Sequence, residues 1–255
     1  MSKLPPWCRV GFETYREATL HVLELLLVVQ DALARAPQAL ALAVAVDNLR
    51  LATAKPIEEP AVESREARLV RERHLANVAQ KEAESGYSSV TALWTIAVWG
   101  YLEAHVEDIL ATWMKHRQSA LQVQVVREVK IPLADYLSAS DDERFAILVQ
   151  EVERKQGAGA QQGIGRFAPL LDALELSAAV PPDVRRDMFE FHNVRNSLAH
   201  RRGVADRRLV TACPWLGLSV GDPVRVSLEQ LAQYIMASAT YMTGIANRME
   251  VLLSA

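Results

Sequence analysis

The sequence predicts an all-α protein, and two observations support this fold class. Apolar residues recur at spacings of three and four along most of the chain, which is the period of an amphipathic helix. Helix-start signals precede several of these segments, including the capping boxes that begin at Ser140 and Ser227. Glycine and proline number only 11 each, so no long stretch has a disordered composition. A multi-helix bundle follows from these features.

The N-terminal part is predicted to contain two helices. Apolar residues at helical spacing over 12–33 indicate the first helix, which Pro37 is expected to end. An Ala-rich and Leu-rich helix follows over 38–54. The segment Lys55-Pro56-Ile57-Glu58-Glu59-Pro60 then breaks the chain, because proline disfavours helix at itself and just before it. Residues 1–60 are therefore expected to form a helical extension and 61–255 the main domain, unless the two are continuous.

The main domain is predicted to hold four helices before a last, C-terminal one. The charged segment 61–84 favours an exposed helix, whereas 87–118 is so apolar, above all over 93–102, that it belongs in the centre of a bundle. Helices are expected over 141–155, after Ser140, and over 183–202, where Pro182 and Asp183 suit the first turn and Gly203 the end. The uncharged run 156–165, with four glycines, predicts a flexible loop or a mobile lip beside a site.

The pattern changes before the last helix. Leu209, Val210 and Thr211 favour a strand, glycines and Pro223 favour turns, and 224–226 suits a second short strand. A small β-hairpin insertion is therefore expected there, followed by a long amphipathic helix that starts at Leu228.

Composition restricts the classes of protein and site. A net charge of -3 and a pI near 6.1 argue against a protein that coats nucleic acid, although a local basic site stays open. Cys8 and Cys213 are far apart and lack metal-ligand spacing, so neither a disulfide framework, a metal nor a cofactor is expected. The N-terminus lacks a signal-peptide core, and the apolar run 20–29 is too short to span a bilayer. We expect a cytoplasmic protein without membrane contact.

One arginine lies in the apolar stripe of the helix predicted over 183–202. At about 100° per residue Arg195 shares that stripe with four apolar residues: Val184, Met188, Phe191 and Leu198. His192, Asn196 and His200 follow one another at intervals of four beside it. A buried cation flanked by imidazoles suits phosphate binding and proton transfer. The alternative is structural, with Arg195 tied to a carboxylate and His200 stabilising the helix end.

Further charged residues are candidates for the same site. Glu103 follows ten residues without formal charge and is a candidate partner of Arg195 or His200, or it marks, with Glu107 and Asp108, where its helix meets solvent. Arginines concentrate around the motif helix: Arg185, Arg186, Arg201, Arg202, Arg207 and Arg208. They form either a phosphate-attracting patch or a solvated helix end balanced by neighbouring aspartates.

The run Arg195-Asn196-Ser197-Leu198-Ala199-His200 resembles the signature of the HEPN superfamily, in which an arginine and a polar residue precede a histidine. Two other segments resemble parts of HEPN proteins: Tyr101-Leu102-Glu103-Ala104-His105, and Ala212-Cys213-Pro214-Trp215-Leu216-Gly217 followed by Val220-Gly221-Asp222. The resemblance covers 87–253 and leaves the N-terminal helices unexplained. It implies a HEPN-like bundle that forms a homodimer with two motifs facing each other.

The resemblance also implies a function, a metal-independent endoribonuclease that leaves 2',3'-cyclic phosphate and 5'-hydroxyl ends. The RNA would be cut in a toxin or phage-defence setting, with an antitoxin or regulatory protein as a further partner. His200 would be the general acid or base, and Arg195 would neutralise the scissile phosphate. Asn196 would orient either the phosphate or the imidazole. Supporting or RNA-binding roles are expected for further residues: Glu103, His192, Arg201, Arg202, Arg207 and Arg208. The alternatives are an inactive HEPN-like scaffold for dimerisation, RNA or protein binding, and an unrelated helical interaction protein.

Overall fold

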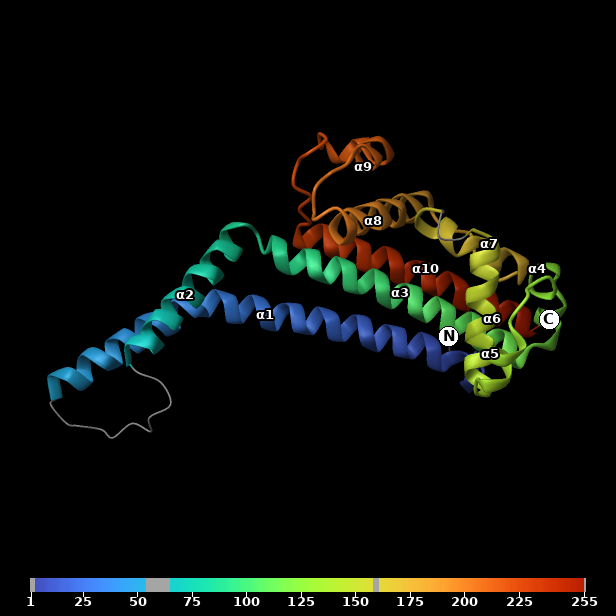
Figure 1. Cartoon of the computed structure of the whole chain (residues 1–255), viewed down its shortest axis with the longest axis horizontal. Coiled ribbons are helices and arrows are strands. Elements are labelled where there is room, and N and C mark those ends of the chain that lie inside the picture. Colours follow the sequence, from blue (N-terminus) through green and yellow to red (C-terminus); the bar gives the residue numbers. More distant parts are fainter. Residues whose placement is uncertain (1–2, 54–64, 158–160, 255) are drawn as a thin grey trace. The chain divides into compact units, whose positions relative to one another are not determined.

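The computed structural model describes residues 3–53, 65–157 and 161–254, and this part of the chain is helical without any strand (Figure 1). The all-α prediction is therefore confirmed. The α-helices are α1 (Pro6–Thr53), α2 (Arg65–Glu84), α3 (Ser88–His116), α4 (Gln124–Arg127), α5 (Leu133–Ser138), α6 (Asp141–Lys155), α7 (Ala168–Ala173), α8 (Pro182–His200), α9 (Arg207–Ala212) and α10 (Leu228–Ser254). Short 3-10 turns are η1 (Gln118–Gln122), η3 (Gly163–Arg166) and η4 (Pro214–Leu216).

The chain divides into two compact units, one of residues 1–22 with 92–255 and one of residues 23–91. In the smaller unit, an ion pair of 2.7 Å joins Arg68 of α2 to the buried Asp47 of α1. The turn between α2 and α3 is fixed by Glu82, whose carboxylate accepts hydrogen bonds from the backbone N–H groups of Ser89 and Val90. The predicted boundary at 55–60 lies outside the described residues.

Pro37 does not end the first helix, so the prediction of two separate helices over 12–54 was wrong. α1 is continuous from Pro6 to Thr53 and contains Pro37. Proline removes one backbone donor and crowds the carbonyl four residues earlier, which weakens a helix without always ending it. The Ala-rich and Leu-rich sequence on both sides of Pro37 has high helix propensity, and this offsets the lost hydrogen bond.

The expected β-hairpin is absent from the described residues, and its first strand was wrongly predicted. Leu209, Val210 and Thr211 belong to α9, because Asp206 caps this helix by accepting a hydrogen bond of 2.9 Å from the Leu209 N–H. This local cap outweighs the weak strand preference of three residues. Residues 224–226 form no strand, and an isolated antiparallel bridge between Val204 and Pro223 is the nearest feature to a sheet here.

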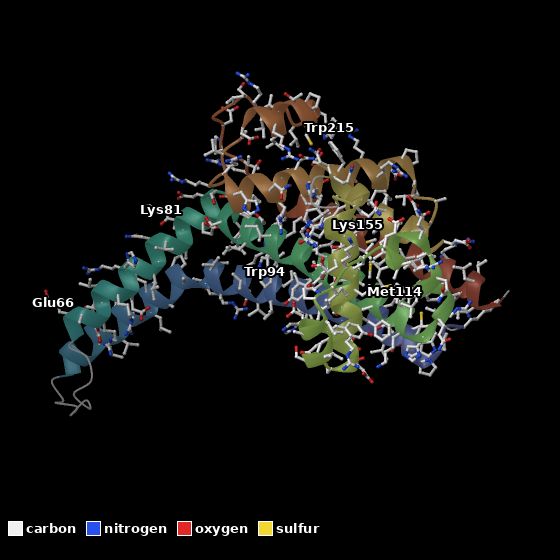
Figure 2. The ribbon with its side chains drawn as sticks, turned by 45° about the vertical axis from the view of Figure 1, so that its right-hand side comes forward. Glu66, Lys81, Trp94, Met114, Lys155 and Trp215 are labelled. Carbon is white, nitrogen blue, oxygen red and sulfur yellow. The ribbon has the colours of Figure 1, made fainter. Side chains whose placement is uncertain are left out.

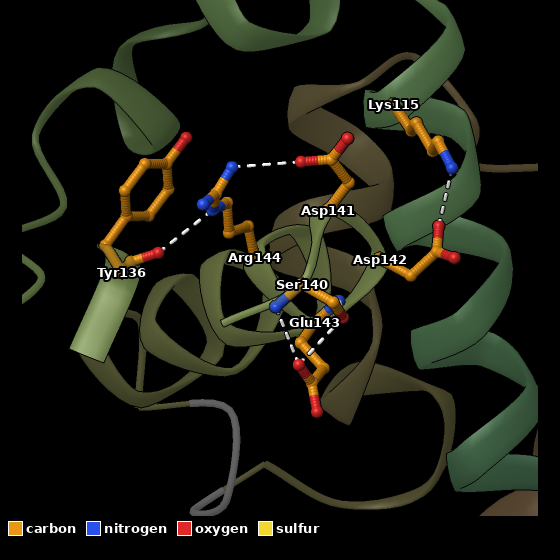
Figure 3. A network of polar contacts seen from close by, with 7 residues as sticks. All are labelled: Lys115, Tyr136, Ser140, Asp141, Asp142, Glu143 and Arg144. Atoms are coloured by element: carbon orange, nitrogen blue, oxygen red, sulfur yellow. Dashed lines mark hydrogen bonds and ion pairs between the residues drawn. The ribbon is translucent and has the colours of Figure 1, made fainter. Parts of the chain in front are cut away.

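Other helix starts agree with the sequence. Ser140 accepts a hydrogen bond from the Glu143 N–H while the Glu143 carboxylate accepts one from the Ser140 N–H, so the predicted capping box opens α6 (Figure 3). In the same view, Lys115 of α3 pairs with Asp142 at 2.6 Å. At the start of α10, Ser227 accepts a hydrogen bond from the Gln230 N–H. The serine caps in the sequence therefore predicted where α6 and α10 begin.

Aromatic packing fixes α8 within the larger unit. α8 contacts α10 and η3. The Phe191 ring stacks on Tyr234 of α10 with centroids 4.7 Å apart, and Trp99 of α3 meets Phe191 edge-on at 5.0 Å. All three side chains are fully buried. Trp99 is therefore part of the core, as are Trp113 and Met114 further along α3, the latter labelled in Figure 2.

Among the residues that the structure describes, one helix has the length and apolar composition needed to cross a membrane. This is α1 over 6–49, and few of its residues in that window are buried. Length and composition alone are weak evidence, since long helices of soluble proteins and signal sequences share them. The cytoplasmic location and the lack of membrane contact therefore stay predictions.

Candidate functional site

α8 carries the motif at its C-terminal end. Three residues of the predicted apolar stripe, Val184, Met188 and Phe191, are buried, whereas Leu198 is half-buried. Val194 is buried as well. The helix ends at His200, two residues before the predicted end, because the N–H groups of Arg201 and Gly203 both turn back to the Ser197 carbonyl. Arg202 and Gly203 have φ values of 58° and 68°, a left-handed conformation that stops a helix and that favours glycine. His200 is therefore the last residue of α8.

Arg195 is held by a carboxylate from α3. Its Nη2 lies 3.3 Å from Glu103 Oε2, and the two side chains are 20% and 15% exposed. Glu103 Oε1 accepts a hydrogen bond of 2.6 Å from Trp99 Nε1 and lies 3.1 Å from Arg166 Nε. The expected pairing of Glu103 with Arg195 is present, and Glu103 also joins a second arginine that the sequence did not indicate.

A chain of hydrogen bonds links Arg195 to His192. Arg195 Nη1 donates to Asn196 Oδ1 at 3.0 Å, and Asn196 Nδ2 lies 2.8 Å from His192 Nε2. Because Asn196 donates through Nδ2, His192 must accept at Nε2 and carry its proton on Nδ1. Burial lowers the pKa of His192 to about 4, with the positive charges of Arg166, Arg195 and Arg208 acting in the same direction. His192 is therefore a neutral acceptor at neutral pH.

His200 differs from His192 in its burial and in its hydrogen bonding. Its side chain is exposed, and it makes no hydrogen bond or ion pair within the described part of the chain. It nevertheless lines the same pocket as Arg195 and Asn196. An imidazole in this position can reach a bound molecule without first breaking a protein contact.

The pocket has a volume of about 270 Å³, and we call it the arginine pocket. Its lining residues come from η3, α8, the turn after α8, and α9: Arg166, His192, Asn193, Arg195, Asn196, Ser197, His200, Arg201, Asp206, Arg208 and Leu209. Arginine is the commonest residue in this lining, with four of the eleven residues. Such a site favours an anionic ligand.

Arg166 is the member of the pocket that sequence reasoning missed. It enters because η3 packs tightly on α8: a Cβ on Gly163 would lie 2.9 Å from Phe189 Cα. Gly163 also has a φ of 57°, so this close approach requires glycine. The glycine-rich run had been interpreted as a loop or lip beside a site, and that signal was the only sequence indication of Arg166.

The other predicted arginines have different surroundings. Arg201 pairs with Asp206 at 3.2 Å, which fits the balanced helix end, whereas Arg208 lines the pocket. Arg202 and Arg207 are exposed and do not line it. Arg186 lies over the ring of Trp215, labelled in Figure 2, at 4.7 Å from its centroid. Of the six arginines that concentrate around the motif helix in the sequence, only Arg201 and Arg208 therefore line the pocket.

Two more carboxylates interact electrostatically with Arg166, Glu107 of α3 and Glu153 of α6. Burial raises the pKa of Glu153 to about 7, helped by the negative charges of Glu107 and Glu103 and opposed by Arg166. Burial likewise raises the pKa of Glu107. No group of three or more His, Cys, Asp or Glu side chains within the described ranges is arranged to hold a metal ion.

Comparisons with known proteins add no family to this geometry. No protein-family model matches the chain, and neither curated proteins nor solved structures give a significant match.

Proposed function

We propose that this chain is a HEPN-type endoribonuclease whose reaction uses Arg195 and His200. The observation that carries the proposal is that a held guanidinium and an unpartnered imidazole line one arginine-rich pocket. RNA offers both groups that such a site needs, a phosphodiester to bind and a neighbouring 2'-hydroxyl to deprotonate. The cleavage requires neither a metal nor a cofactor.

The chemistry is an internal transfer of the phosphoryl group. The ribose 2'-oxygen attacks phosphorus, its proton passes to an imidazole, and the bond from phosphorus to the 5'-oxygen breaks as that oxygen gains a proton. The products are a 2',3'-cyclic phosphate and a 5'-hydroxyl. His200 supplies the proton transfer, and Arg195 stabilises the charge that develops on the phosphorane oxygens.

Asn196 has a positioning role in this proposal. Its side chain connects Arg195 to His192, so it fixes the guanidinium rather than reaching for a proton itself. A homodimer would bring two copies of His200 together, one as base and one as acid. A toxin or phage-defence setting, with an antitoxin or other regulatory partner, belongs to the same proposal.

The second candidate is an inactive HEPN-like scaffold for dimerisation, RNA binding or protein binding. The Glu103–Arg195 ion pair favours it, because Glu103 already neutralises part of the positive charge that a phosphate would use. The two candidates agree on anion binding at the pocket and differ in whether His200 transfers a proton.

Cleavage in the presence of EDTA separates them. Purified wild type and His200→Ala are incubated with single-stranded RNA, and the ends are identified by treatment with phosphatase and polynucleotide kinase. The substitution should lower the cleavage rate by about 100-fold or more, the usual contribution of a general acid or base. His74→Ala is the matched control, because His74 is an exposed histidine of α2 that is not among the pocket residues.

Thermal unfolding should be unchanged in both variants, since both side chains are exposed. Equal cleavage by wild type and His200→Ala would contradict the proposal, as would the complete absence of cleavage.

A further inference from the structure

We propose that Arg166 and Arg208, together with Arg195, form a binding site for one phosphate group in the arginine pocket of each protomer. The identification of this phosphate as part of an RNA backbone rests on the proposed function, but the binding of phosphate does not. Two of these arginines, Arg166 from η3 and Arg208 from α9, lie outside the six-residue motif.

Arg166 is the strongest evidence for an anion-binding site. Its side chain is only 26% exposed, yet it makes no hydrogen bond within the described residues. Its Nε atom is buried without a hydrogen-bond partner, although Glu103 Oε1 lies 3.1 Å away. A largely buried guanidinium ordinarily satisfies its donors, because leaving them unpaired is costly. The two Nη atoms of Arg166 have no hydrogen-bond partner within the described residues, and Arg166 lines the pocket, so an anion there can accept from them.

The two other arginines also keep unused donors. Arg195 uses one N–H of Nη1 for Asn196 and one N–H of Nη2 for Glu103, which leaves a second N–H on each of these nitrogens. Arg208 is exposed, and Gln162 accepts from its Nη2 and Nε at 3.1 and 3.3 Å when the amide oxygen faces α9. Nη1 of Arg208 has no partner within the described residues. Three guanidinium groups with free donors therefore line one cavity.

The nearby acidic residues offset only part of this positive charge. Asp206 is the single acidic residue of the lining and pairs with Arg201. Glu103 is not among the lining residues, and it binds Arg166 and Arg195 at 3.1 and 3.3 Å. Glu107 and Glu153 also interact electrostatically with Arg166, and burial favours the protonated form of both. The lining therefore keeps free cationic donors for a ligand.

Phosphate fits these donors better than a carboxylate does. A phosphate offers three or four oxygens in a tetrahedral arrangement, so guanidinium groups from η3, α8 and α9 can each bind a different oxygen. A carboxylate offers two oxygens in one plane and a single charge. We therefore expect inorganic phosphate to bind and acetate at the same ionic strength to bind much more weakly.

The test is a calorimetric titration of the full-length chain with inorganic phosphate at constant ionic strength, with acetate as the comparison anion. Arg208→Gln should weaken phosphate binding by about ten-fold, because it removes a charge-assisted hydrogen bond. Arg207→Gln is the matched control: it lies next to Arg208 in α9, is equally exposed, and does not line the pocket. It should change the affinity by less than about two-fold, since exposed charges at a distance are screened.

Arg166→Gln should weaken phosphate binding by at least as much as Arg208→Gln. If this inner substitution prevents folding, the exposed pair Arg208→Gln and Arg207→Gln still decides the question. Equal losses in that pair would overturn the site, because they would show a diffuse electrostatic effect. Equal binding of acetate and phosphate would overturn it as well.

The two proposals fail in different ways. Wild type that cleaves RNA but does not bind phosphate in the titration overturns this inference and leaves the ribonuclease proposal standing. Wild type that binds phosphate through Arg208 but leaves RNA intact supports this inference and overturns the ribonuclease proposal.

Discussion

The inner wall and the rim of the arginine pocket differ in how far their charged side chains are buried and in how they are paired. The inner wall consists of Arg166, His192 and Arg195 with Glu103 behind them, and these side chains are largely buried. The rim consists of His200, Arg201 and Arg208, which are exposed. On the inner wall, ion pairs and hydrogen bonds fix each group, whereas His200 on the rim has no partner within the described residues.

Because of this difference, the inner-wall residues contribute to the stability of the fold, whereas the rim residues contribute mainly to function. A buried charge whose partner is removed stays desolvated, so inner-wall substitutions should cost stability as well as activity. An exposed charge that is removed is replaced by water at little cost. Rim variants are therefore the cleaner probes of catalysis and binding, and inner-wall variants test how the site is built.

The largest effect is expected on the inner wall, for Glu103→Gln. The substitution leaves Arg166 and Arg195 without their shared carboxylate and should lower the free energy of unfolding by about 3 kcal/mol. Equilibrium unfolding in urea measures it. Glu153→Gln is the comparison, and it should cost far less because the pKa of Glu153 is already raised to about 7. Equal stability of Glu103→Gln and wild type would mean that the inner wall does not depend on this ion pair.

An intermediate effect is expected from pH, because two groups near the pocket act with opposite sign. The pKa of Glu153 is raised from 4.5 to about 7, so the folded chain keeps a proton that the unfolded chain releases. Its stabilising contribution is present below pH 4.5 and is lost as the pH rises towards 7. The pKa of His192 is lowered from 6.5 to about 4, so its contribution is present above pH 6.5 and is lost as the pH falls towards 4.

Single substitutions should expose each contribution. Between pH 4.5 and 6.5, the stability of Glu153→Gln should rise with pH more steeply than that of wild type, because only the His192 contribution remains. The stability of His192→Gln should fall as the pH rises when it is compared with wild type, because only the Glu153 contribution remains. Urea midpoints at several pH values in this range measure both slopes. Parallel curves for all three proteins would show that neither pKa differs between the folded and unfolded chains.

The smallest effect is expected just beyond the rim, for Arg202→Gln. Arg202 is exposed and does not line the pocket, so it can contribute to RNA binding only through general attraction to the backbone. The affinity for single-stranded RNA should fall by about two-fold or less, and the dependence of log affinity on log salt should weaken by well under about one unit, the change expected for a direct phosphate contact. Fluorescence anisotropy at several salt concentrations tests this. A change in the cleavage position would instead assign Arg202 to the reacting site.

Much of the helical framework was predictable because its signals are local. The starts of α6 and α10 follow from Ser140 and Ser227, whose side chains cap the next turn. The continuous helix at Pro37 and the helix at Leu209 were mispredicted. Proline has a low helix propensity, and Leu209, Val210 and Thr211 were expected to favour a strand. In each case neighbouring residues decided the outcome, which single-residue preferences do not capture.

The spacing of residues along the chain was enough to place Arg195 on the apolar stripe of a helix and to name Glu103 as its candidate partner. It also placed Asn196, His192 and His200 beside that arginine, because a helix fixes the spacing of its own side chains. Only the tertiary structure decided which histidine is buried and which is free, and that Arg166 joins the pocket. Those facts depend on the approach of η3 and α9 to α8, and contacts between segments far apart in the chain have no fixed period to reveal them.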